Sequence, residues 1–331
     1  MRTTRAIPRL MPPRKLRSHT RESETRAAIS LVSIYNLAMN PTPPGSLRET
    51  DTIVPGEPLI AFKDVHIGFA DNDVLRGISF EVWPGETKVL LGESGSGKTL
   101  VMKLAAGLLP ADSGKVWVMG QNVDDMNENQ LLDFRRHVGF VFQEGALFDS
   151  LTVSDNVAFR LREENFPEPE IAQRVREALR FVELEQALEK YPDELSGGMR
   201  RRVSIARALI DKPPLIFYDS PTAGLDPVTS QTIINLILRG RDLQGVTSLL
   251  ATHRVQDALG LAHFRFDAQA NRVQRIDGNG AKPAAQGASH PEAPPTNILV
   301  LREGSIYFEG PADEILRSSD DYLKKFLASA E

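Results

Sequence analysis

The hydrophobic pattern divides most of the chain into short strands and amphipathic helices. Apolar runs bounded by Gly, Pro, Asp and Asn are typical of strands. They occur at residues 59–62, 65–69, 78–82, 87–91, 116–119, 215–219, 247–251, 298–301 and 305–308. Strands both precede and follow a glycine-rich loop at 92–99, so we expect a small antiparallel sheet beside the main one.

Helical periodicity fills much of the remainder. Residues 171–190 space their apolar side chains for one helix face, at Ile171, Val175, Ala178, Leu179, Val182 and Leu188. Further helices are expected at 100–109, directly after the glycine-rich loop, at 200–210 and at 313–330. The pattern therefore predicts an α/β protein.

Two segments lack this periodicity. Through residue 27 the chain carries eight Lys or Arg against two Glu, a local charge of +6, and prolines recur as far as residue 55. We predict that residues 1–57 form a disordered basic extension; the alternatives are initiation at Met39 and an arm that contacts anionic lipid. Residues 267–296 are rich in Gly, Pro and Ala, which predicts a disordered insertion, with a regulatory contact as the alternative.

Composition excludes several classes of function. The 331 residues include no Cys, which excludes disulfides and thiolate chemistry and fits a reducing compartment. The net charge of −5 gives no electrostatic footprint for nucleic acid, so none is expected as a partner. No apolar run approaches the roughly 18 residues of a membrane span, so work at a membrane would depend on partner proteins.

The glycine-rich loop matches the phosphate-binding pattern G-x-x-x-x-G-K-[ST] without a mismatch. It comprises Gly92, Glu93, Ser94, Gly95, Ser96, Gly97, Lys98 and Thr99. Its glycines let backbone N–H groups point at phosphate oxygens, and the following helix directs the positive end of its dipole to the same place. Lys98 adds a cation for the β- and γ-phosphates, and the Thr99 hydroxyl can coordinate Mg²⁺. The loop therefore predicts binding of a nucleoside triphosphate with Mg²⁺.

Two later features fit a phosphate-loop enzyme. Asp219 ends an apolar strand, where such enzymes place a second Mg²⁺-positioning group. Ser196, Gly197 and Gly198 open a helix, which is another anion-binding geometry, although such turns are common. The arginines at 200–202 are predicted to form a solvated face, with a contact to a membrane subunit as the alternative.

The order of these motifs resembles the nucleotide-binding subunit of ABC transporters, from residue 59 to the C-terminus. The resemblance implies a P-loop NTPase fold of the ABC ATPase type, with a RecA-like core sheet, a small antiparallel β subdomain and a helical signature subdomain. It implies one nucleotide-binding domain at 58–331, with the helical subdomain at about 143–210. It also implies an ATPase that uses ATP and Mg²⁺.

The resemblance carries roles for individual residues. Phe69 would stack on adenine, Gln143 would link Mg²⁺ to the membrane partner, and Asp219 would bind Mg²⁺ together with Thr99. The signature residues Ser196, Gly197 and Gly198 would contact the γ-phosphate held by a second subunit. Asp226 would belong to the D-loop, and His253 would be the switch histidine.

Three local sequences resemble the ATPases of Mla or MCE-type phospholipid transporters: residues 142–148, residues 151–159, and Met199 with the arginines after it. This implies a transmembrane permease, a second ABC subunit forming a homodimer, an MCE-domain lipid-binding partner, and a peripheral location on the cytoplasmic face of the inner (plasma) membrane. The alternatives are the ATPase of an amino-acid or other small-solute importer, and a regulatory ABC protein without a permease. A single phosphate loop and a single signature favour a transporter subunit.

Ser220 departs from the family pattern, in which a Glu after Asp219 is the general base that polarises the attacking water. A hydroxyl is not a proton acceptor near neutral pH, and a positioned base contributes roughly 10²–10⁴-fold in rate. We therefore expect slow hydrolysis, sustained by His253, Gln143, Lys98 and Mg²⁺. The alternative is that other water-orienting groups suffice and that Ser220 is a tolerated variant.

Overall fold

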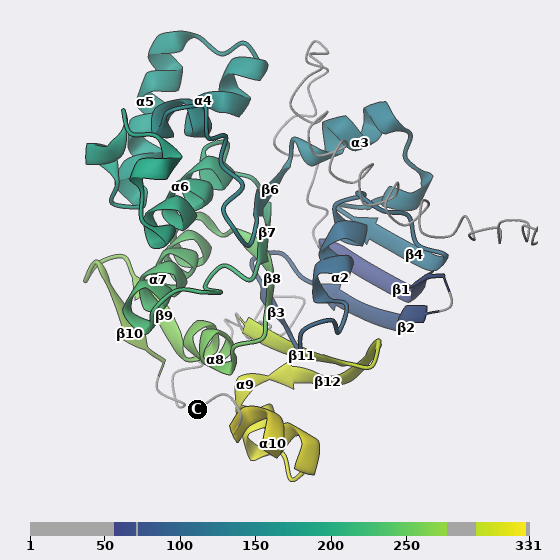
Figure 1. Cartoon of the computed structure of the whole chain (residues 1–331). Helices are drawn as coiled ribbons and strands as arrows, with labels where there is room; N and C mark the ends of the chain where they lie inside the picture. Colours follow the sequence, from purple (N-terminus) through teal and green to yellow (C-terminus); the bar gives the residue numbers. More distant parts are fainter. Residues whose placement is uncertain (1–55, 71, 277–295, 329–331) are drawn as a thin grey trace, which may run out of the picture. The chain divides into compact units, whose positions relative to one another are not determined.

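The computed structural model describes residues 56–70, 72–276 and 296–328, and residues 1–55 of the extension predicted at 1–57 lie outside these ranges (Figure 1). The core is a six-stranded sheet in the order β12–β11–β3–β8–β7–β6. Neighbours from β11 to β6 pair in parallel, and β12 runs antiparallel to β11. The strands are β3 (Thr87–Leu91), β6 (Val138–Val141), β7 (Leu215–Asp219), β8 (Thr247–Thr252), β11 (Thr296–Arg302) and β12 (Ser305–Pro311).

Both faces of this sheet are buried, because successive side chains of a strand point to opposite sides. Leu90, Phe217 and Leu249 belong to one apolar cluster, shared with α2 (Lys98–Ala105) and the second sheet. Val89, Ile216 and Leu250 belong to the other, shared with the later helices. The central strands β3, β7 and β8 are accordingly buried along their whole length.

The predicted antiparallel sheet is present beside the core, in the order β2–β1–β4–β5. Its strands are β1 (Ile60–Phe69), β2 (Asn72–Val82), β4 (Ser113–Val118) and β5 (Gln121–Asn122). The strands predicted separately at 59–62 and 65–69 are one strand, β1. Its pairing with β2 shifts register between Phe62 and Val65, where Asp64 has a φ of 50°. This local irregularity explains why the apolar pattern is interrupted there.

Helices follow the strands along the chain: α3 (Glu128–Arg135), α4 (Val153–Glu163), α5 (Glu168–Phe181), α6 (Gly197–Leu209), α7 (Pro227–Gln244) and α8 (Val255–His263). The pairs α4–α5, α4–α6 and α5–α6 are in contact, which gives the helical subdomain. The helix predicted at 171–190 ends instead at Phe181, after which Glu183 adopts a φ of 59°. None of the helices described is long and apolar enough to cross a membrane.

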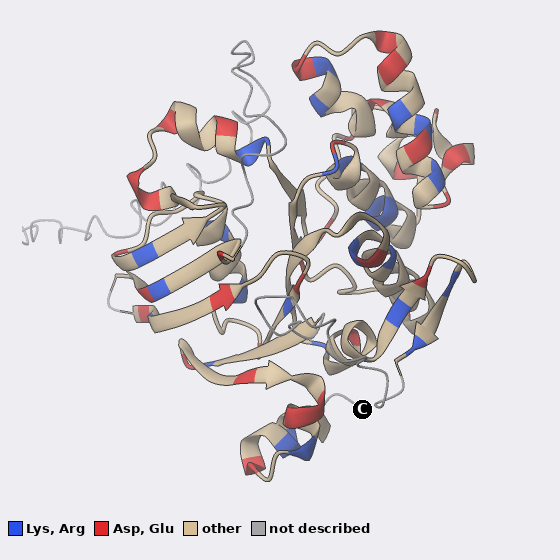
Figure 2. Ribbon diagram, turned by 180° about the vertical axis from the view of Figure 1, so that it is seen from behind, with Lys and Arg blue, Asp and Glu red and all other residues tan. Residues whose placement is uncertain are grey.

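Basic and acidic side chains are interspersed on α4 and α5, as Figure 2 shows. Several form ion pairs, among them Arg162 with Asp155 at 2.7 Å. The helical subdomain therefore presents charges of both signs.

Two expectations for the C-terminal part were wrong. Structure continues into the predicted disordered insertion, because β9 (Phe264–Asp267) and β10 (Arg272–Arg275) form an antiparallel hairpin; residues 277–295 lie outside the described range. The single helix predicted at 313–330 is two helices, α9 (Ala312–Arg317) and α10 (Asp321–Ala328). Asp320 separates them, and its Oδ1 accepts a hydrogen bond from Leu323 N at 2.9 Å.

Candidate functional site

The glycine-rich loop joins β3 to α2 and folds around its own lysine. Lys98 Nζ donates to the carbonyl oxygens of Gly92 and Glu93, each at 2.8 Å, and to Ser96 Oγ at 3.3 Å. Burial lowers the pKa of Lys98, and the nearby charges of Asp219 and Glu93 oppose this effect. A cation held among loop backbone groups suits the binding of phosphate oxygens.

Two positions of the loop accept no side chain. At Gly92, whose φ is 156°, a Cβ atom would lie 2.5 Å from Leu301 O. At Gly97, whose φ is 95°, a Cβ atom would lie 2.6 Å from Leu75 Cδ2. The backbone of β11 therefore excludes a side chain at Gly92, and at Gly97 the positive φ disfavours any residue other than glycine.

Thr99 and Asp219 meet at the mouth of this loop. Thr99 Oγ1 donates toward the carboxylate of Asp219, at 3.2 Å from Oδ1 and 3.1 Å from Oδ2. Hydroxyl and carboxylate oxygens are the ligands that Mg²⁺ prefers, so this pair fits the Mg²⁺ ion predicted from the sequence. The contact joins the start of α2 to the end of β7, although 120 positions separate the two residues.

Ser220 is held beside this pair by its backbone. Its φ is 47°, and its N–H donates to Ala251 O at 2.8 Å. Its hydroxyl donates to Asp219 Oδ1 at 3.3 Å. The side chain therefore already acts as a donor to the carboxylate next to it, and it offers no base of its own.

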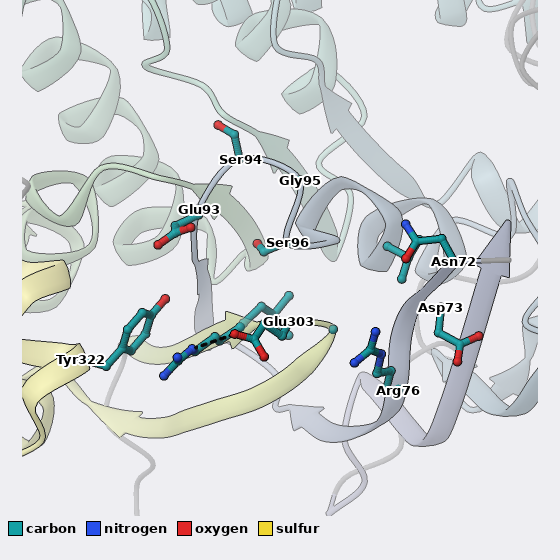
Figure 3. Close-up of a pocket in the computed structure, with 13 residues that line it drawn as sticks. Asn72, Asp73, Arg76, Glu93, Ser94, Gly95, Ser96, Glu303 and Tyr322 are labelled. Atoms are coloured by element: carbon teal, nitrogen blue, oxygen red, sulfur yellow. Dashed lines mark ion pairs between the residues drawn. The ribbon is translucent and has the colours of Figure 1, made fainter.

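Two hollows flank the loop. One, of about 330 Å³, is lined by Phe69, Val74, Lys98 and Thr99 among others, and places the predicted adenine-stacking ring beside the phosphate-binding groups. The other, of about 490 Å³, lies between loop residues 93–96, the start of β2, the β11–β12 turn and Tyr322 of α10. Figure 3 shows Glu93, Ser94 and Ser96 along one side of this second hollow and Arg76 and Tyr322 on others.

The signature residues lie elsewhere, at the start of α6. Ser196 is exposed and caps the helix, with its Oγ accepting from Met199 N at 3.3 Å. Gly197 lies near Leu225, and Gly198 packs against Thr229 of α7. None of the three lines either hollow beside the glycine-rich loop.

Gln143 is exposed in the turn after β6, and two arginines of α6, the buried Arg201 and the half-buried Arg207, hold that turn. Arg201 donates to Phe142 O at 3.2 Å and to Ala223 O at 3.3 Å. Arg207 donates to Gly145 O and Ala146 O, and burial lowers its pKa to about 10. The prediction of a solvated face was therefore wrong for Arg201, which has 7% of its surface exposed.

Asp226 and His253 lie at the ends of two further segments. Asp226 caps α7, and its Oδ1 accepts from the N–H groups of Val228 and Thr229, each at 3.0 Å. A hydrogen bond from the Thr229 hydroxyl lowers the pKa of Asp226. His253 is exposed directly after β8.

The sequence argument missed a buried hydrogen-bonded group behind these residues. Asp257 of α8 accepts hydrogen bonds from the hydroxyls of Thr222 and Thr252. A sequence signal was available: Asp257 lies four residues after His253, at a spacing that places it on the first turn of the following helix.

Several known proteins are similar to this chain. The family model described as "ABC transporter" matches residues 75–223. The intermembrane phospholipid transport ATP-binding protein MlaF of Haemophilus influenzae is 31% identical, over 78% of this chain and 97% of that one. The chloroplast protein trigalactosyldiacylglycerol 3 of Arabidopsis thaliana is 32% identical, over 81% of this chain and 73% of that one.

Another relative is named for a different substrate. The sulfate/thiosulfate import ATP-binding protein CysA of Nitrosomonas europaea is 38% identical, over 66% of this chain and 60% of that one. Among solved structures, the dimeric post-hydrolysis state of the ATP-binding cassette MJ0796 with ADP and Pi is similar, with a TM-score of 0.61 and 26% identity, over 76% of this chain and 98% of that one.

Proposed function

This chain belongs to the ATP-binding subunits of ABC transporters, and we propose that it powers phospholipid transport through a membrane permease. The chain is an ABC-type ATPase that uses ATP and Mg²⁺. ABC cassettes work as dimers with transmembrane permease partners. The substrate, the second subunit and the location of the complex are parts of the proposal.

One observation carries the choice of phospholipid. The similarity to MlaF covers 97% of that protein, whereas the similarity to CysA covers 60% of its length. The local sequences at 142–148 and 151–159 favour the same subfamily. The second candidate is a small-solute importer, which is favoured by the higher identity to CysA over the shared part.

We assign each site residue a part in binding. Lys98 and the N–H groups of the loop hold the β- and γ-phosphates, and Phe69 stacks on adenine. The Mg²⁺ ion is held by Thr99, Asp219 and Gln143. The γ-phosphate is covered by Ser196, Gly197 and Gly198 of a second copy. Bound Mg²⁺ supplies neutralisation of the charge on the phosphate oxygens. His253 and Asp226 lie in segments that complete the site when two copies meet.

Hydrolysis at this site is slow in our proposal, because Ser220 stands where a general base is expected. In a homodimer both sites would carry Ser220. Phosphoryl transfer depends mainly on positioning and charge stabilisation, so Lys98, Gln143 and His253 sustain a residual rate. Closure of the dimer around the nucleotide then drives the permease, since binding energy shifts the conformational equilibrium.

The complex would lie on the cytoplasmic face of the inner membrane, with an MCE-domain lipid-binding protein as a further partner. The test is to purify the full chain with its membrane partners, reconstitute them in liposomes, and follow a fluorescent phospholipid during ATP addition. ATP-dependent movement that Lys98→Ala abolishes supports the proposal. If sulfate or an amino acid were taken up, or stimulated hydrolysis, and no lipid moved, the small-solute importer would replace the phospholipid transporter as the proposed function.

A further inference from the structure

A buried carboxylate connects the segment that carries His253 to the segment that carries Ser220. Asp257 lies in the first turn of α8 and has 2% of its surface exposed. Its Oδ2 accepts a hydrogen bond from Thr252 Oγ1 at 2.8 Å and a second from Thr222 Oγ1. Thr252 directly precedes His253, and Thr222 lies two residues after Ser220. One oxygen atom therefore links both segments.

Arg254 links the same segments from the other side of His253. Its Nη1 donates to Thr222 O at 3.3 Å and to Ser230 Oγ of α7 at 2.8 Å. Its Nε lies 3.8 Å from Asp257 Oδ1. The residue before His253 and the residue after it are thus both tied to the chain between Ser220 and α7.

The stability of the folded chain does not by itself explain a buried carboxylate at this position. Thr222 and Thr252 have 0% and 1% of their surface exposed, so the carboxylate is enclosed in the protein interior. Burial raises the pKa of Asp257, which means that its charged form is held at a cost. Well-packed apolar residues often stabilise the folded state as much as a buried charged group does, or more. The carboxylate does, however, fix the position of the segment after β7 relative to the end of β8.

We propose that Asp257 is a positioning residue for ATP hydrolysis, which keeps His253 in register with Ser220 and with the D-loop through Thr252 and Thr222. A change at His253 on contact with the γ-phosphate would then be transmitted to the chain between Thr222 and Asp226. This inference rests on the site assignment in the proposed function, because it gives His253 a role at the phosphate. Small misplacements of reacting groups are costly, since about 1 Å can lower a rate by about 10²-fold.

The test compares threonine variants in the full chain purified with its membrane partners. Thr222→Val removes the hydroxyl and keeps the shape, whereas Thr222→Ser keeps the hydroxyl. Thr232→Val is the matched control for the exchange itself, because Thr232 is half-buried on α7 and its hydroxyl donates to Val228 O of the same helix at 3.1 Å. We expect Thr222→Val to lower kcat about 10-fold with an unchanged KM for ATP, and Thr222→Ser to keep most of the rate. The same pair at position 252 provides a second measurement if Thr222→Val unfolds.

Non-additivity supplies an independent readout. If one carboxylate ties both segments, Thr222→Val with Thr252→Val should lower kcat little more than either change alone, whereas independent effects would multiply. The inference is overturned if Thr222→Val behaves like Thr232→Val, or if Thr222→Ser loses as much activity as Thr222→Val. His253→Ala distinguishes failure of the proposed function from failure of this inference. Wild-type hydrolysis in that variant would refute the assignment of His253 to the site. A large loss in His253→Ala with no loss in Thr222→Val would refute only the positioning role of Asp257.

Discussion

The methyl group of Thr229 lies where any side chain at position 198 would have to go, so Gly198 of the signature packs directly on the start of α7. The Thr229 hydroxyl is fixed at the same time, because it donates to Asp226 Oδ2 at 2.5 Å. The signature and the D-loop of one chain are therefore packed as a unit, and the clash cannot be relieved by a simple rotation of Thr229.

This contact predicts a loss of function that a second change restores. Gly198→Ala should destabilise the chain by about 1–3 kcal/mol, as overpacking does, and should lower ATP hydrolysis at least about 10-fold by displacing the start of α6. Adding Thr229→Ser removes the methyl group and keeps the hydroxyl, so activity should return in part. Urea unfolding and hydrolysis rates measure both effects. Equal activity in the single and double variants would contradict the packing argument.

Ser220 predicts a gain on substitution. Ser220→Glu should raise the hydrolysis rate, by up to about 10²–10⁴-fold if the base is the missing element. Ser220→Gln is the matched control, because it has the shape of Glu without the carboxylate, and it should give no such gain. The measurement is steady-state phosphate release by the purified complex. Normal transporter activity in the wild type with no gain in the variant would mean that the chemistry does not need this base.

Phe69 predicts a specific loss of nucleotide affinity. Phe69 is 38% exposed and lines the same hollow as Lys98 and Thr99. Stacking of a base on an aromatic ring contributes about 1–3 kcal/mol, so Phe69→Ala should raise the Kd for ATP by about 5- to 150-fold, and Phe69→Trp should not. Trp117→Ala removes an exposed aromatic residue of β4 outside both hollows and should leave the Kd unchanged. Titration calorimetry distinguishes these results.

The contact of Thr99 with Asp219 predicts how hydrolysis depends on Mg²⁺. Thr99→Val removes one oxygen ligand, so the Mg²⁺ concentration for half-maximal hydrolysis should rise by about 10-fold or more, whereas Thr99→Ser should retain the wild-type value. Titrating Mg²⁺ at a fixed ATP concentration tests this. An unchanged midpoint in Thr99→Val would remove the residue from the Mg²⁺ site.

Asp257 predicts a pH-dependent difference in stability. Burial raises its pKa in the folded chain above the ordinary value, although Thr222 and Thr252 oppose the shift. Its contribution to stability is therefore greatest at acidic pH and declines as pH rises through the folded pKa. Asp257→Asn lacks this titration, so the free energy of unfolding of the wild type minus that of the variant should decrease from about pH 4 to about pH 7.5. Urea unfolding across this range measures the trend, and a difference that grows with pH would contradict it.

Local sequence determined much of this protein. The glycine-rich loop, the apolar strands entering and leaving the site, and the acidic end of β7 are all defined by short stretches, because loop geometry and strand burial depend on neighbouring residues. The order of motifs identified the family, and with it the α/β architecture. Errors occurred where one residue interrupts a helical pattern. Glu183 has a φ of 59° after α5, and Asp320 accepts a hydrogen bond from Leu323 N before α10.

The tertiary structure decided what pairs across the chain. Neighbouring residues did not predict that Arg201 would be buried against the carbonyl groups of Phe142 and Ala223, or that Asp257 would join Thr222 to Thr252. Such contacts depend on which strand ends the parallel sheet brings together, and side chains 30 or more positions apart meet only after the sheet has formed. The residues next to a charged side chain in the sequence predict that it is exposed to solvent. Only the folded chain supplies the hydrogen-bond partners that allow it to be buried.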